Sequence, residues 1–208
     1  MLALLLSLAM FAVFFTLLWK GVAKIARSPH RNLLVSLCIA VAAALPIGWH
    51  VITQRFTMSM VPDALGVSSV SYSAEESWGF GPGGNETGVH LYPLSAQVSQ
   101  QITEQGSAYF EAMPPNDDQA SRGWRGQDAH WQPTPIATTV TRPTEEKAVP
   151  FSLEAYHDAY GFSIAIDDAV STQVNRILQT PGAYYAYGRI GIIVVSPGER
   201  LVVYMYNG

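Results

Sequence analysis

The sequence predicts an α+β protein: an N-terminal two-helix transmembrane hairpin followed by an extracytoplasmic α+β domain with antiparallel strands. Three observations predict it. The first 62 residues contain two apolar spans and no aspartate or glutamate. All 16 acidic residues lie from Asp63 onward. The last stretch of the chain has a helical apolar pattern followed by strand-like runs.

The hairpin is predicted over residues 1–52. Its spans, about 1–19 and 33–51, each approach the ~20 apolar residues that cross a hydrocarbon core of about 30 Å. The loop 20–32 between them is basic, with Lys20, Lys24, Arg27 and Arg31. Short loops rich in Lys and Arg stay on the cytoplasmic side, so both chain ends are expected outside. In a bacterium this predicts an inner-membrane protein, N-out and C-out, embedded in the lipid bilayer, with its large domain in the periplasm.

Two alternative topologies fit the sequence less well. A cleaved signal peptide has basic residues ahead of its apolar core, whereas here the charges follow the first span. A cytoplasmic C-terminal domain requires a basic flank after the second span, and only Arg55 is there. The second span also contains small residues that favour helix packing in lipid, either on the first span or on another membrane subunit. Pro46 is expected to kink its last turn or mark its end.

Charge and cysteine content exclude some functions. Residues 63–208 hold seven basic and 16 acidic residues, so they carry nine net negative charges. Phosphate binding needs basic clusters, so no nucleic-acid partner is expected. The one cysteine, Cys38, lies inside the second span, which excludes an intrachain disulfide and cysteine catalysis in the outer domain. Cys38 is interpreted as a packing residue.

A juxtamembrane linker, 53–65, is expected to lead into the periplasmic domain, 66–208. A short strand is predicted over Val67–Tyr72, a glycine-rich loop over Trp78–Gly88 and another strand over Val89–Leu94. A helix capped by Ser95 follows, weakened in its middle by Gly106. Its apolar positions fall near one face: Val98, Ile102, Tyr109, Phe110 and Met113.

Residues 114–150 form a long Pro-rich excursion with little regular structure. Trp124 and Trp131 are its exceptions to polarity. They either pin the loop to the domain or face a partner, because loops carry much of binding function.

The C-terminal pattern is the clearest. A short helix-like run covers Leu153–Tyr160. Asp167 or Asp168 can cap the next helix, whose apolar positions Val170, Val174, Ile177 and Leu178 share one face. A strand is predicted over Ala183–Val195, a type II turn over Ser196–Glu199, and a partner strand over Leu201–Tyr206.

The glycine-rich loop matches G-x-G-x-x-G from Gly79 to Gly84. A dinucleotide site requires a strand before this motif and a helix directly after it, whereas a strand-like run follows here. We therefore predict no nucleotide cofactor. The loop is interpreted as a structural or protein-contact element, with a glycan or ligand pocket as the alternative. The predicted partner-binding residues are Trp78, Phe80, Asn85, Glu86, Trp124 and Trp131.

No local motif for a nucleophile or for zinc is present in the sequence. We therefore assign no catalytic residue, no metal ligand and no cofactor. The leading hypothesis is a non-catalytic accessory protein whose periplasmic domain binds a membrane or periplasmic protein. The alternative is an envelope hydrolase that uses His90 or His157 with a nearby carboxylate. His90, His130 and His157 could also assemble a metal site with Asp167 or Asp168, although no local motif predicts one.

Overall fold

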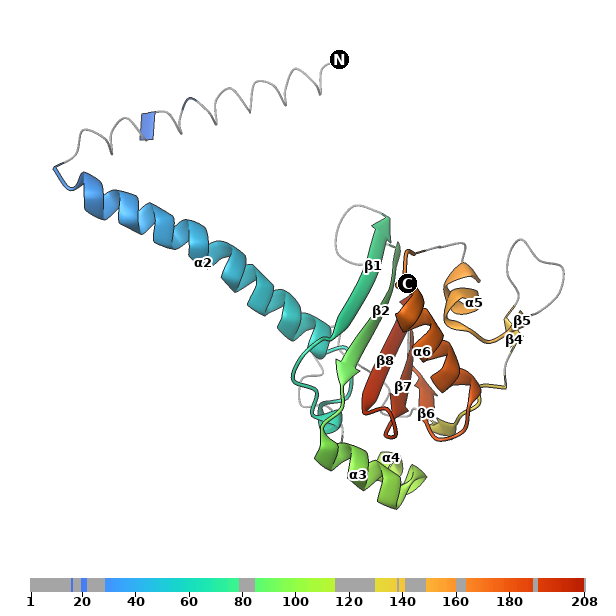
Figure 1. The fold of residues 1–208 in the computed structure, drawn as a ribbon. Coiled ribbons are helices and arrows are strands. Elements are labelled where there is room, and N and C mark those ends of the chain that lie inside the picture. The colour runs from blue at the N-terminus through green and yellow to red at the C-terminus, as the bar shows by residue number, and fades with distance from the viewer. Residues whose placement is uncertain are drawn as a thin grey trace, which may run out of the picture. The chain divides into compact units, whose positions relative to one another are not determined.

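The structure is a computed structural model of the 208-residue chain. It describes Thr16, Lys20, Gly21 and residues 29–78, 85–114, 130–137, 139–140, 149–159, 164–188 and 191–207. The chain divides into two compact units, Met1–Ile52 and Thr53–Gly208. The second unit is α+β with an antiparallel sheet, as predicted (Figure 1).

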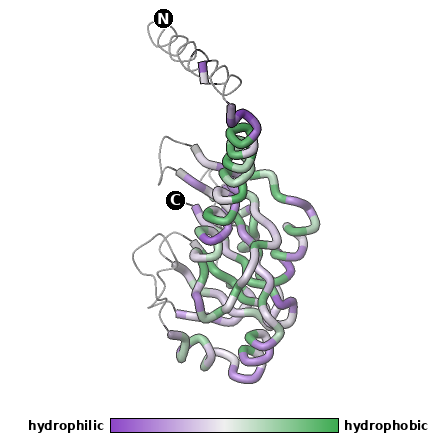
Figure 2. Tube along the Cα trace, turned by 90° about the vertical axis from the view of Figure 1, so that its left-hand side faces the viewer, coloured by the Kyte–Doolittle hydropathy of each residue, from purple (hydrophilic) through white to green (hydrophobic). Residues whose placement is uncertain are grey.

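Helix α2, Arg31–Met58, is long and apolar enough to cross a membrane by length and composition. No residue is buried in the most apolar 18-residue stretch of α2, and hydrophobic residues follow one another along the helix (Figure 2). The first predicted span lies outside the described residues, apart from the helical Thr16. The two-helix hairpin therefore stays a prediction.

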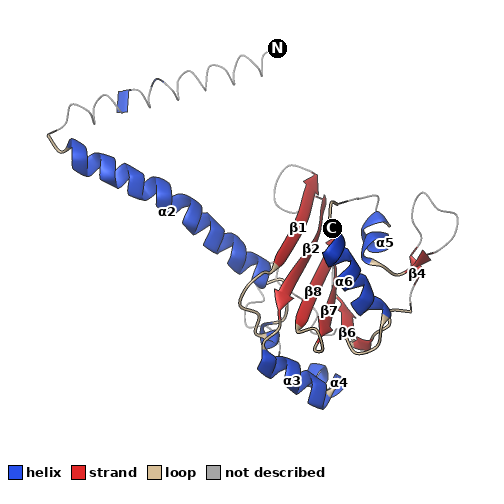
Figure 3. Ribbon diagram, viewed as in Figure 1, coloured by secondary structure: helices blue, strands red, loops and turns tan. Residues whose placement is uncertain are grey.

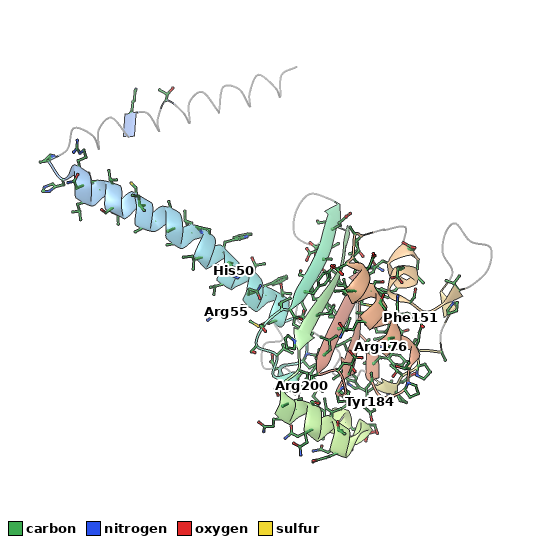
Figure 4. All side chains as sticks on the ribbon, viewed as in Figure 1. His50, Arg55, Phe151, Arg176, Tyr184 and Arg200 are labelled. Carbon is green, nitrogen blue, oxygen red and sulfur yellow. The ribbon has the colours of Figure 1, made fainter. Side chains whose placement is uncertain are left out.

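Helix α2 does not end at Pro46 but continues to Met58, past the labelled His50 and Arg55 (Figure 4). Proline removes one backbone hydrogen bond from a helix. The last turn of the helix packs within the second unit. Thr57 is buried there, and the Tyr92 hydroxyl donates to its backbone oxygen at 2.8 Å. The segment predicted as a linker thus begins as helix and continues through a short 3-10 helix, Asp63–Leu65.

The main sheet has six strands in the order β1-β2-β8-β7-β6-β3, and each neighbouring pair is antiparallel. Figure 3 shows these strands with the helices around them. A separate ladder pairs two short strands, β4 with β5. The strands are β1 Tyr72–Trp78, β2 Asn85–Pro93, β3 Gln132–Pro133, β4 Thr139–Val140, β5 Val149–Pro150, β6 Tyr184–Tyr187, β7 Gly191–Ser196 and β8 Leu201–Asn207.

The helices of the domain include α3 Ala96–Gln105, α4 Ser107–Glu111, α5 Leu153–Asp158 and α6 Asp168–Gln179. Helices α5 and α6 lie close to their predicted positions, whereas α3 and α4 occupy the stretch predicted as one helix. The Ser95 side chain accepts from the Val98 amide, and that of Asp167 accepts from the Ala169 amide, so both predicted caps are confirmed. Gly106, with a φ of 60°, separates α3 from α4 instead of only weakening one helix.

The sheet is covered on both faces. Successive strand residues point to opposite faces, so Val89 and Leu91 belong to one core and Tyr92 to the other. We call the first the α6 face, because Val174, Ile177 and Leu178 of α6 pack on it (Figure 1). The second is the α3 face, where Ile102 and Phe110 pack, together with Val61, Leu65 and the tyrosines of β8.

Two strand predictions were wrong in position. Residues 67–70 are irregular, and the strand begins at Tyr72. The polar run Tyr72–Trp78 is held as a strand by its pairing with β2, which no local pattern reveals. The predicted strand over Ala183–Val195 is instead the hairpin of β6 and β7, in which the Gly188 amide donates to the Gly191 oxygen at 2.7 Å.

The turn before β8 also differs from its prediction. A type II turn over Ser196–Glu199 would place Gly198 at positive φ. In the structure the positive φ, 51°, lies at Arg200, whose amide donates to the Pro197 oxygen at 3.1 Å. The hairpin of β7 and β8 itself is confirmed, with Ser196 opposite Leu201.

Candidate functional site

The hairpin of β1 and β2 brings together three of the six predicted partner-binding residues. Trp78 and Asn85 are cross-strand neighbours, and Glu86 follows opposite Ser77. Both ends of the predicted loop over Trp78–Gly88 are thus strand, because Trp78 and Asn85–Gly88 pair between β1 and β2, whereas residues 79–84 lie outside the described residues. Phe80 and Trp124 lie outside the described residues, as do the side chains of Trp78 and Asn85.

Trp131 has a structural environment. Its ring stacks on that of Phe110, with centroids 4.2 Å apart, and Phe110 also contacts Tyr184. This stack attaches the start of the 130–137 segment to the α3 face of the sheet. Of the two readings for Trp131, the contacts favour the one in which it pins the loop to the domain.

A row of four cross-strand neighbours begins in this hairpin and continues across the sheet: Glu75 on β1, Gly88 on β2, Tyr206 on β8 and Gly191 on β7. The Tyr206 ring lies over Gly88, where an added Cβ would come within 2.7 Å of the hydroxyl oxygen. Glycine thus lets the ring reach the edge strand. There its hydroxyl donates to Glu75 Oε2 at 2.7 Å.

His90 lies next to this row, on the same face. It is 1% exposed, and its ring is 5.5 Å from that of Tyr206. Neither ring nitrogen has a hydrogen-bond partner among the described residues. The nearest charged atom is Glu75 Oε2, 3.8 Å from Nε2. Burial lowers the pKa of His90 to about 4 and outweighs the opposing attraction of Glu75, so the ring is neutral at pH 7.

His157 occupies the equivalent place on the α6 face. It is 1% exposed on α5, and its Nδ1 lies 2.8 Å from the Thr87 hydroxyl of β2. Burial lowers its pKa to about 4, against a hydrogen bond to Asn207 and the charges of Asp158 and Glu154, which raise it. Two histidines on opposite faces thus share one property, a neutral ring held away from water.

The Thr87 hydroxyl has one hydrogen and three neighbours that can take it: Asn207 Oδ1, the Tyr206 backbone oxygen and His157 Nδ1. When the hydrogen goes to Asn207 or Tyr206, Nδ1 carries the proton of the neutral His157 ring and donates to Thr87; when it goes to Nδ1, the ring proton is on Nε2. The Asn207 amide nitrogen donates in turn to the Tyr156 oxygen at 3.0 Å. Nε2 of His157 has no hydrogen-bond partner among the described residues.

Sequence reasoning selected His90 and His157 but missed the residues that connect them, above all Thr87 and Tyr206. The strand register places these residues together, so their separation along the chain hides the cluster. Gly88 and Gly191 were the available signal, since glycine inside a strand marks a place where something approaches the backbone closely.

Other predicted residues do not join this cluster. His130 is exposed, so His90, His130 and His157 do not form one site. Within the described ranges no group of three or more His, Cys, Asp or Glu is placed to hold a metal ion. Comparison of the chain with protein-family models, with curated proteins and with solved structures finds no match.

Proposed function

We propose that this chain is a membrane-anchored accessory protein of a bacterial inner membrane whose periplasmic domain binds a protein partner without catalysis. The observation that carries the anchor is the surface of α2. Leu33, Leu45 and Ile47 are 64–70% exposed, and Trp49 is 73% exposed. A helix that is apolar all round is stable when lipid surrounds it.

The join between α2 and the domain supports a retained span over a cleaved signal sequence. Thr57 is buried in the domain's own unit, and Val61 just after the helix is fully buried. Cleavage near the end of α2 would remove the backbone oxygen that accepts from Tyr92. The basic residues that precede α2 support a cytoplasmic start and a periplasmic end for this helix.

The end of the β1–β2 hairpin is the surface we propose for the partner. β1 is the edge strand of the sheet, and Ser73, Glu75, Glu76 and Ser77 are exposed along it. An edge strand offers backbone donors and acceptors to an incoming segment. In the sequence, aromatic Trp78 is the last residue of β1 and Phe80 follows two residues later. Aromatic side chains carry much of the free energy of protein–protein binding.

Co-purification tests this proposal. Tagged full-length protein is extracted in mild detergent, and a stoichiometric membrane or periplasmic partner is expected with it. The double variant Trp78→Ala/Phe80→Ala should lower recovery of the partner at least tenfold, about the effect of losing one hot-spot residue. Tyr187→Ala, at an exposed tyrosine on β6, should leave recovery unchanged.

Three results of this experiment are distinct. A clean, partner-free protein would contradict the accessory role. A partner that both variants retain would place the binding surface away from the hairpin. Loss of the partner together with a lowered free energy of unfolding would mean that Trp78 and Phe80 act through folding.

One observation bears on the hydrolase alternative. His90 does lie beside a carboxylate, Glu75, at 3.8 Å. A general base must reach the proton that it takes from a substrate or a water. His90 and His157 are each only 1% exposed, which weighs against both as that base. The glycan- or ligand-binding alternative rests on the loop 79–84, which lies outside the described residues.

A further inference from the structure

Both buried histidines connect to the same residue, Tyr206, from opposite faces of the sheet. On the α6 face, His157 contacts the Thr87 hydroxyl, which lies 3.2 Å from the Tyr206 backbone oxygen. On the α3 face, the Tyr206 hydroxyl bonds Glu75 Oε2, the atom nearest to His90. The end of β8 is therefore held on two sides by groups next to neutral histidines.

We infer that these five residues, Glu75, Thr87, His90, His157 and Tyr206, form an acid-opened clasp. When the two histidines take up protons, the end of β8 separates from β2 and frees the adjoining end of the β1–β2 hairpin. The rest of the sheet and α6 stay folded. This inference does not depend on the proposed partner, although opening would loosen the surface proposed for it.

A proton on His157 has no acceptor in the closed clasp. In the protonated ring both nitrogens carry a proton, and Nε2 is buried and unpartnered among the described residues. The charged groups that act on this ring, Glu154 and Asp158, both lie on α5 itself. Their attraction is smaller than the cost of burying the charge, so opening to water is the favoured response.

A proton on His90 acts on the clasp more directly. Glu75 is the charged group facing its ring, and Tyr92, Tyr204 and Tyr206 are the titratable groups around it. To accept from His90, Glu75 Oε2 must move from 3.8 Å into hydrogen-bond range. That atom already accepts from Tyr206. Protonation therefore draws Glu75 toward His90 and weakens its bond to Tyr206.

The effect is confined to one end of the sheet. The rows farther along β2 and β8 pair Leu91 with Val203 and Tyr92 with Val202, among buried apolar residues of β7. Proton uptake by the two histidines does not change these contacts. The clasp therefore opens before the apolar cores separate, as expected for a local unfolding unit.

The size of the effect follows from the pKa difference between the closed and open states. Each histidine has a pKa of about 4 when closed and an ordinary value of 6.5 when open to water. Lowering the pH from about 7.5 to about 5.5 then raises the ratio of open to closed clasp about tenfold for each histidine, and about a hundredfold for both together.

Hydrogen–deuterium exchange on the full-length chain in detergent micelles tests this, with rates corrected for intrinsic exchange at each pH. Between about pH 7.5 and about pH 5.5, protection of amides in 86–90 and 204–207 should fall by about a hundredfold. Protection in α6 and in residues 192–195 should change less than threefold, roughly. An unchanged β8 end, or an equal loss of protection in every strand, would overturn the clasp.

Substitution of each histidine separates their contributions to the pH effect. His90→Gln and His157→Gln should each remove about tenfold of the pH effect, and the double variant all of it. His130→Gln, at an exposed histidine, is the matched control and should keep the full effect. If the glutamine variants do not fold, Tyr206→Phe serves instead. It should raise opening of the β8 end at neutral pH, because the bond to Glu75 is lost, and an unchanged protection would contradict the clasp.

Discussion

Helices α2 and α6 place their apolar side chains in opposite environments. In α6, Val174, Ile177 and Leu178 are at most 3% exposed against the sheet. In α2, Leu37 and Ile39 are 59% and 64% exposed. The same residue types therefore build a protein core in one helix and an uncovered surface in the other. The difference supports the proposal that α2 is a membrane anchor, in which lipid covers its apolar side chains.

The largest expected effect is that lowering the pH reduces the free energy of unfolding of the domain, while α2 is unaffected. Each buried histidine has a folded pKa of about 4, below its unfolded value of 6.5. Their contribution to stability is present above pH 6.5 and is lost as pH falls toward 4, by roughly 3 kcal/mol for each histidine. Urea unfolding of the full-length protein, followed by tryptophan fluorescence across this range, measures it. A flat profile would contradict the buried neutral state of both rings.

The next largest effect is the free-energy cost of placing charged side chains in α2. The double variant Leu37→Arg/Val41→Arg should shift the protein out of the membrane fraction, at roughly 2.5–3.5 kcal/mol for each arginine near the bilayer centre. The control, Thr172→Arg at an exposed position of α6, should leave fractionation unchanged. If the α2 variant stays in membranes after carbonate washing, α2 is not a span.

Truncation of one apolar side chain compares the two helices directly. Ile177→Ala removes a side chain that is 3% exposed in the core and should lower the free energy of unfolding of the domain by about 2–5 kcal/mol. Leu37→Ala should leave that quantity unchanged, because Leu37 contributes nothing to the domain's cores. Denaturant titration of both variants checks this. A similar loss for Leu37→Ala would show that α2 packs as a core helix.

The smallest effect concerns the close approach at Gly88. Gly88→Ala places a methyl group where the Tyr206 ring lies and should cost about 1–3 kcal/mol, because the ring must move from Glu75. Gly198→Ala, with open space around its Cβ, is the matched control. Thermal unfolding of the two variants separates them. Equal midpoints would mean that the Tyr206 ring is not held over Gly88.

Elements with strong local patterns were predictable from the sequence. The apolar spacing of α6, the caps at Ser95 and Asp167, and the hairpin of β7 and β8 all follow from neighbouring residues. The second apolar span was predictable from composition alone. Its continuation past Pro46 to Met58 was not, and the contact of its last turn with Tyr92, far along the chain, has no local signal.

The candidate site was only partly predictable, for the same reason. Trp78, Asn85 and Glu86 were selected from one short segment, and the hairpin keeps them together. His90 and His157 were selected singly, as histidines. Their connection through Tyr206 depends on the register between β2 and β8, which brings residues more than a hundred positions apart to the same row. No periodicity in the sequence encodes that register.

Cysteine accessibility in intact spheroplasts tests the central claim, an anchored protein with its domain outside the cytoplasm. Cys38→Ser gives a cysteine-free background. A single cysteine is then placed at Ser107, exposed on α4, or at Ser28 in the basic loop before α2. A membrane-impermeant maleimide should label the Ser107→Cys protein at once and the Ser28→Cys protein only after the membrane is opened. The reverse order, or labelling of both proteins in intact spheroplasts, would contradict the account.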